Sequence, residues 1–275
     1  MATLIIARLT FLEAVRRRVL LAGFVLGVAF LALYATGFYF MIHEAVPSSP
    51  SSSVAAASIR SGLASFLSLA GLYAVDFLVI AMGALISADS VAGEIASGAI
   101  QAVVTKPIRR AQVILGKWLG LAWLLALYLL LMAGGVVAVA FAVTGYTSPN
   151  AATGLALFYF EALLVMSITL ACSSALSALA TGGVVFGLYG VAFIGGWIEQ
   201  FGSFLQNQTA INVGIISSLI MPSESLWRRA SFEMTPAIAQ LVGAAVAGPF
   251  FTESVPSPFM LVYAGLYLLA AVGFA

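Results

Sequence analysis

Two carboxylates, Asp76 and Glu161, stand inside long apolar runs of the sequence. A charge at the centre of a bilayer costs at least ~2.5–3.5 kcal/mol on insertion scales, so such a side chain faces protein or water. Both residues fall in the outer halves of their runs, at comparable depth. They line a transport path, share a proton, or hold helices together as neutral hydrogen-bonding carboxyls. We treat them as candidate transport-path residues and leave the three roles open.

Other reactive patterns are missing from the sequence. There is no G-x-x-x-x-G-K-[ST] phosphate loop, no H-E-x-x-H and no G-x-S-x-G. One histidine, His43, and one cysteine, Cys172, leave no set of metal ligands and no internal disulfide. We therefore expect a chain that is not an enzyme and that holds no cofactor or metal of its own.

The composition indicates a membrane protein. The chain is 63% hydrophobic and 8% charged, against about 25% charged in soluble domains. A helix needs roughly 20 apolar residues to cross the hydrocarbon core. We predict an all-α polytopic membrane protein with six transmembrane helices in residues 19–275. The predicted spans are Val19–Ile42, Leu63–Ser87, Trp118–Val143, Gly154–Leu179, Gly182–Ile198 and Pro258–Ala275.

The basic residues predict the orientation. Eight of the eleven lie before the first span or between the second and third, on one side of the membrane. The positive-inside rule makes that side cytoplasmic. We expect a multi-pass protein of the cell (inner or plasma) membrane, surrounded by lipid, with both termini in the cytoplasm. A net charge of +1 gives no reason to expect nucleic acid as a partner.

The predicted outer segments differ in character. Residues 43–62 read as a mobile linker, whereas 199–257 form a long outer loop with several prolines. Within that loop Ile211–Met221 is too short to cross and is expected to lie at the interface or to dip in and return, a seventh span being the alternative. Gly195 and Gly196, together with Pro222, are candidates for an outer gate. The tryptophans at 197 and 227 fit an aromatic belt.

The first eighteen residues are predicted to form an amphipathic helix on the cytoplasmic surface. Ile5, Leu9, Leu12 and Val15 keep helical spacing, and neighbouring arginines reach the lipid phosphates by snorkelling. An equally open interpretation is a basic flank that only orients the first span.

Residues 88–117 form a polar, basic elbow between the second and third spans. Asp89–Ile100 is predicted to be a short amphipathic helix, which Pro107 bars from continuing through residue 106. Arg109 then opens a helix that runs into the third span. The alternative is a solvated loop whose charges only set the topology.

The elbow resembles the cytoplasmic elbow of the type-2 ABC exporter permeases. The resemblance is carried by a Gly-Glu pair, a Pro-aliphatic-x-Arg turn and a Gly-Lys at the next span, although Ala99 replaces the usual threonine. The number of spans, the basic amino-terminal helix and the long outer loop are also similar. The last span ends at Ala275 without a basic tail, which leaves open whether the chain is complete. The residues that carry the resemblance are Asp89, Gly93, Glu94, Gly98, Ile100, Pro107, Arg109 and Lys117.

The resemblance implies half of an exporter. Two permease copies pair, and two separate ABC ATP-binding subunits, which hold the ATP and magnesium, dock on the elbows. The segment 93–100 then lies in a groove of the ATP-binding subunit, with Glu94 as its main polar contact and with Arg8 and Glu13 at a second contact. The alternative is an ion-coupled secondary transporter that uses Asp76 and Glu161, although no internal repeat supports it. The cargo is not determined by the sequence.

Overall fold

The structure, a computed structural model, describes residues 2–45, 53–98, 109–237 and 254–275. All of the regular elements in these ranges are helices. In chain order they are α1 (Ala2–Arg16), α2 (Arg18–Ala45), α3 (Ser53–Ala96), α5 (Arg110–Thr144), α6 (Ala151–Ala175), α7 (Ala178–Phe204), α8 (Gln208–Ile220), α9 (Ser223–Met234) and α12 (Pro258–Phe274). The predicted all-α class is therefore confirmed for the described part of the chain.

Within the described residues, five helices are long and apolar enough to cross a membrane: α2, α3, α5, α6 and α7. They correspond to the first five predicted spans. The predicted sixth is α12, which has 17 residues and therefore a length of about 25 Å, short of the roughly 30 Å hydrocarbon core. A multi-pass helical membrane protein is thus established, and the sixth crossing stays a prediction.

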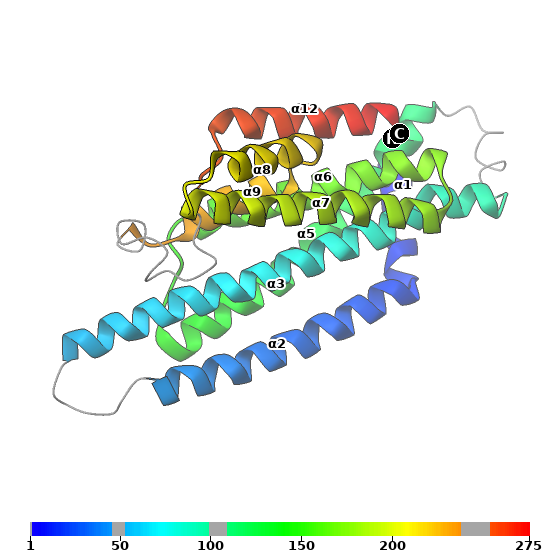
Figure 1. Cartoon of the computed structure of the whole chain (residues 1–275). Helices are drawn as coiled ribbons and strands as arrows, with labels where there is room; N and C mark the ends of the chain where they lie inside the picture. Colours follow the sequence, from blue (N-terminus) through cyan, green and yellow to red (C-terminus); the bar gives the residue numbers. More distant parts are fainter. Residues whose placement is uncertain (1, 46–52, 99–108, 238–253) are drawn as a thin grey trace.

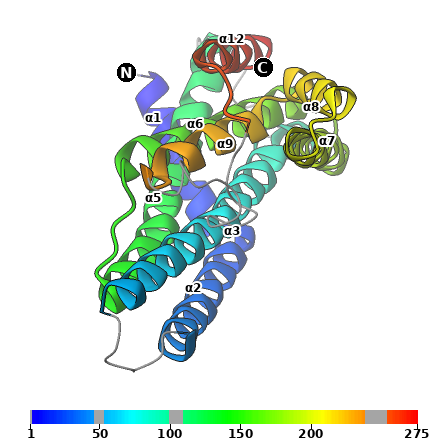
Figure 2. The ribbon, with the colours of Figure 1, turned by 60° about the vertical axis from the view of Figure 1, so that its left-hand side comes forward.

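The long helices lie side by side, and α3 is the central one (Figure 1). It packs against α2, α5, α6 and α7, whereas α2 lies at one edge of the bundle (Figure 2). We call the end that contains Ala96 and Arg109 the elbow end, and the opposite end the far end. Both ends of the chain lie toward the elbow end (Figure 1).

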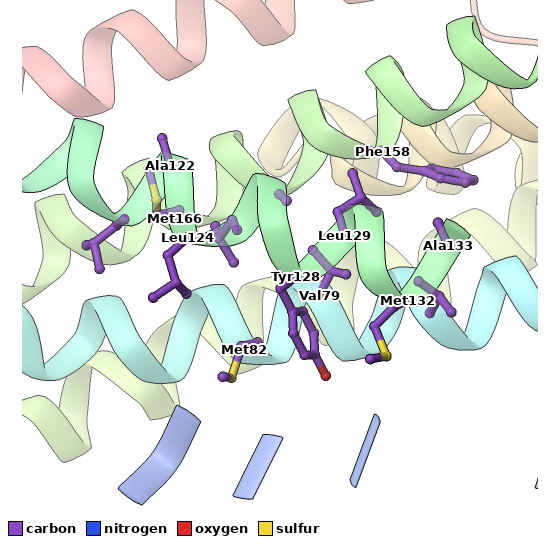
Figure 3. Packing of buried hydrophobic residues seen from close by; sticks show 14 of the residues in the cluster. Val79, Met82, Ala122, Leu124, Tyr128, Leu129, Met132, Ala133, Phe158 and Met166 are labelled. Carbon is purple, nitrogen blue, oxygen red and sulfur yellow. The ribbon is translucent and has the colours of Figure 1, made fainter. Parts of the chain in front are cut away.

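The main core fills the space between α3, α5 and α6 (Figure 3). Met82 of α3 and Met132 of α5 also reach α2, where Gly23 and Gly27 leave room for them. The Tyr128 hydroxyl donates a hydrogen bond to the Gly23 carbonyl over 3.0 Å. Small residues that let helices approach closely are typical of membrane bundles. The four-residue spacing of Gly23 and Gly27 therefore has a packing role in α2.

The segment after α7 enters the bundle from the far end and returns. Asn207 caps α8 by accepting hydrogen bonds from the amides of Thr209 and Ala210 at 3.0 and 3.3 Å. α8 packs along α7 as a hairpin, and after a turn α9 runs back between α6 and α7 (Figure 1). With 13 residues, α8 is about 20 Å long and too short to cross alone. The path of α8 and α9 back along the bundle agrees with a short segment that does not cross, and the predicted dip into the membrane stays a prediction.

Candidate functional site

The elbow end differs from the prediction in one respect. Asp89, Gly93 and Glu94 are in the last two turns of α3, not in a separate helix. Nothing in the sequence breaks the helix before Gly98, whose φ of +72° lies in the left-handed region that ends helices. Ile100 and Pro107 lie outside the described residues. Arg109 caps α5, which runs into the third span as predicted.

A buried lysine joins the end of α3 to α5. Lys117 Nζ lies 2.6 Å from Glu94 Oε1, and the two side chains are only 6% and 23% exposed. The ammonium also donates a short hydrogen bond to the Ser90 carbonyl. A buried ammonium needs such partners because desolvation is costly. The Gly-Lys motif had marked this position, but not its bond to Glu94.

An arginine joins α1 to α3. The Arg17 guanidinium contacts Asp89 and donates to Glu13 Oε1 over 2.6 Å. Burial disfavours the cation, but the hydrogen bonds and charges of Glu13 and Asp89 outweigh this cost and raise the pKa of Arg17. Two of the predicted ATPase-contact residues are therefore held by one cation.

The helix predicted at the amino terminus is present as α1, and its place on the cytoplasmic membrane surface stays a prediction. Its exposed face carries Leu4, Ile5, Leu9 and Leu12, and Arg8 is exposed beside them. Its other face packs on α5, where Gly116 and Gly120 admit Ile6 and the Ala7 carbonyl. The elbow end thus gathers α1, α3 and α5 into one ion-paired unit.

A second polar site lies inside the bundle. Asp76 of α3 and Glu161 of α6 are 2% and 0% exposed, and they lie within electrostatic range of each other. Glu224 of α9 joins them and is 4% exposed. Among the described residues, Oδ1 of Asp76 and both oxygens of Glu161 have no hydrogen-bond partner. The structure therefore brings the two predicted transport-path residues together and adds a carboxyl that the sequence reasoning missed.

An ion pair lies beside these carboxyls. Arg228 Nη1 and Nη2 lie 2.7 and 2.9 Å from the two oxygens of Glu199, and the Ser254 hydroxyl donates to Glu199 over 2.7 Å. Burial raises the pKa of Glu224 to about 8, although the Arg228 charge lowers it and the Glu199 charge raises it. The sequence placed Arg228 in the long loop 199–257, whereas the structure places it in the helix α9 with a side chain that is only 2% exposed.

Aromatic rings hold α9 in place. Trp227 stacks on Phe158 at 5.1 Å between ring centroids, and its ring lies 4.6 Å from that of Tyr73. The Trp197 indole donates to the Tyr73 hydroxyl over 3.0 Å. The aromatic-belt interpretation is therefore wrong for Trp227, which is 3% exposed.

The predicted gate residues meet at one junction. α7 continues as a helix through Gly195 and Gly196. A Cβ on Gly195 would collide with the Ser217 side chain, and one on Gly196 would collide with Glu224. Pro222 precedes the first residue of α9. These three residues are thus placed where α7, α8 and α9 touch, and their role in gating stays a prediction.

This junction yields a first prediction. Gly196→Ala forces Glu224 to move, and we expect the free energy of unfolding to fall by about 1–3 kcal/mol, the usual cost of overpacking. The matched control is Gly187→Ala on the same helix, where a Cβ meets open space. Thermal unfolding of both variants in detergent measures the difference. Equal stability of the two would contradict the close packing of α9 on α7.

Fold and composition define a polytopic helical membrane protein with an ion-paired unit at one end and a buried polar site in its interior. The sequence model of a family described as ABC-2 family transporter protein matches residues 4–274. The chain therefore belongs to this family and is a permease component of an ABC transporter, as the elbow motif had indicated. The family implies that it pairs with an ABC ATP-binding subunit. No protein of curated function matches the chain.

Proposed function

We propose that the chain is the membrane subunit of an ATP-driven exporter, paired with a second permease copy and driven by two separate ATP-binding subunits that dock on the elbow. The observation that carries this proposal is the ion-paired unit at the elbow end. Arg17 and Lys117 hold the acidic end of α3 against α1 and α5. A force applied to Asp89–Ala96 by a docked subunit then moves three helices together.

The same force reaches the interior through one rigid element. α3 is a single helix of 44 residues that holds both Glu94 and Asp76. The 18-residue separation corresponds to about 27 Å along the axis. Because α3 is unbroken between Glu94 and Asp76, a displacement of the elbow is transmitted to the buried carboxyls without an intervening hinge.

Pairing is supported by the surface of α2. Only 6% of an apolar 18-residue stretch of α2 is buried against the rest of the chain. Between α2, α3 and α7 lies an apolar groove of about 680 Å³, walled by Phe30, Phe77, Tyr189 and Phe193 among others. A helix of a second copy would fill that groove through van der Waals packing, which drives the association of helices in membranes. Membership of the ABC-2 family favours this assembly over an ion-coupled secondary transporter.

The experiment is charge reversal at Glu94 with the ATP-binding subunit co-expressed. We expect Glu94→Lys to weaken co-purification of the subunit and its nucleotide turnover at least about tenfold, since losing a paired charge at an interface costs roughly 2–5 kcal/mol. Glu44→Lys, the same change at the far end of α2, serves as the control.

A double variant separates attachment from local packing. Glu94→Lys combined with Lys117→Glu restores an ion pair inside the chain but reverses the charge offered to a partner. If the double variant is stable yet still detached, Glu94 acts on the ATP-binding subunit. Normal attachment in correctly inserted Glu94→Lys protein would refute docking through this residue.

A further inference from the structure

Three carboxyls from three helices meet in the interior without a cation of their own. They are Asp76, Glu161 and Glu224, and none is more than 4% exposed. The other titratable or charged groups within electrostatic range of them are Tyr73, Tyr189, Glu199 and Arg228. Arg228 is the basic group in this set, and both of its terminal nitrogens face Glu199. In the described part of the chain, Arg228 is therefore the one positive charge near the three carboxyls; it is already ion-paired with Glu199 and does not offset the effect of burial on Glu224.

The hydrogen bonds of this site indicate independently that its carboxyl oxygens need a donor. Glu161 is fully buried with both oxygens unpartnered, and one oxygen of Asp76 is also unpartnered among the described residues. A buried carboxylate without donors is costly. A protonated carboxyl is a donor as well as an acceptor, so one proton satisfies two neighbouring oxygens.

We propose that Asp76, Glu161 and Glu224 form a proton-binding site, whose shared protons seat α9 against α3 and α6 and whose deprotonation releases α9. The ligand of this site is the proton, supplied by the solvent. The inference goes beyond the proposed function, and it requires neither a second copy nor an ATP-binding subunit.

The geometry makes α9 the element that responds. Glu224 is the one carboxyl of the three that lies on a short helix, and its side chain rests against Gly196 of α7. Asp76 and Glu161 are fixed within long helices whose neighbours hold them on several sides. Repulsion among ionised carboxyls is therefore relieved most easily when α9 leaves, and Trp227 then leaves its place between Phe158 and Tyr73.

The sign of the pH effect follows from Glu224. Burial raises its pKa to about 8 when α9 is seated, whereas a solvated glutamate has a pKa of about 4.3. The seated form thus binds more protons between these values. Its advantage is complete below about pH 4.3 and is lost as the pH rises toward 8. Each proton released shifts the equilibrium by up to about tenfold per pH unit in this window.

Hydrogen–deuterium exchange of the full chain in lipid nanodiscs between pH 5 and 8 tests the proposal. After correction for the intrinsic pH dependence of exchange, we expect the exchange rate of peptides from α9 to rise with pH, by up to about tenfold per pH unit for each proton released. Peptides from the core of α5 report whether the bundle stays folded, and they should not change. An α9 whose corrected exchange does not vary with pH would overturn the proposal.

Two variants identify the groups involved. Glu224→Gln and Glu161→Gln each remove one titrating carboxyl while keeping the shape, and we expect each to flatten the pH dependence of α9 exchange. Glu233→Gln is the matched control, because Glu233 lies on the same helix but pairs with Arg229 at a partly exposed site. If both variants keep the full pH dependence, the carboxyls are not the sensor. The wild-type measurement stays decisive if a variant fails to fold.

Discussion

Arg228→Met is expected to lower the free energy of unfolding by about 3–5 kcal/mol, because it leaves Glu199 as a buried charge without its partner. The two side chains are 2% and 5% exposed, and the guanidinium contacts both carboxylate oxygens. Removing the cation also deprives Glu224 of the positive charge that lowers its pKa. Chemical unfolding in detergent, followed by the exchange of α9 peptides, measures the loss.

The neighbouring residue supplies the control for this change. Arg229 pairs with Glu233 one helical turn away, and both side chains are more than 20% exposed. Because exposed pairs contribute little, Arg229→Met should cost less than about 1 kcal/mol. The double variant Glu199→Gln/Arg228→Met leaves no unpaired charge, so we expect it to be more stable than Arg228→Met alone. Equal losses for Arg228→Met and Arg229→Met would contradict the burial of the ion pair.

The burial of Arg228 could not be predicted from the sequence. α9 contains two arginines, two glutamates and three serines, so it does not resemble a buried helix by composition. Nine of its twelve residues are nevertheless buried. The helix is tolerated inside the bundle because Arg228 pairs with Glu199 of α7 and because the Trp227 ring packs on Phe158 of α6 and Tyr73 of α3. Such partners come from positions far apart in the sequence, so no local sequence pattern predicts them.

The spans, by contrast, were predictable because hydrophobic length is a local property. The five helices of spanning length in the part of the chain that the structure describes lie where the apolar runs place them. At the elbow, one prediction is confirmed and another is wrong within a few residues of each other. Arg109 begins the helix that enters the third span, as the proline-containing turn indicated. The separate helix expected from Asp89 is instead the end of α3, since no breaker lies between the second span and Gly98.

The motif residues of the elbow were predictable, but their partners were not. The pattern marked Asp89 and Glu94 as contacts for another subunit, and it marked the arginines as topology signals. In the structure, Asp89 binds Arg17 and Glu94 binds Lys117. A docking subunit must therefore share or exchange these ion pairs.

Lys117→Met is expected to lower the free energy of unfolding by about 3 kcal/mol, the lower end of the range for broken buried pairs, because Glu94 keeps some contact with water. The Glu94 side chain is 23% exposed, whereas that of Lys117 is 6% exposed. The Ser90 carbonyl loses its donor as well. Since this lysine holds the end of α3 on α5, we also expect nucleotide turnover by an attached ATP-binding subunit to lose its dependence on the permease.

The control is Arg110→Met, which removes an exposed cation from the same helix. It should leave both stability and coupling unchanged, because exposed charges contribute little. In the double variant Glu94→Gln/Lys117→Met no charge is left unpaired, so stability should recover while coupling stays lost. That combination would show that Glu94 and Lys117 act in coupling and not only in stability. If the double variant recovers both stability and coupling, the ion pair only stabilises the fold. If Lys117→Met alone keeps its coupling, the elbow does not transmit force from the ATP-binding subunit.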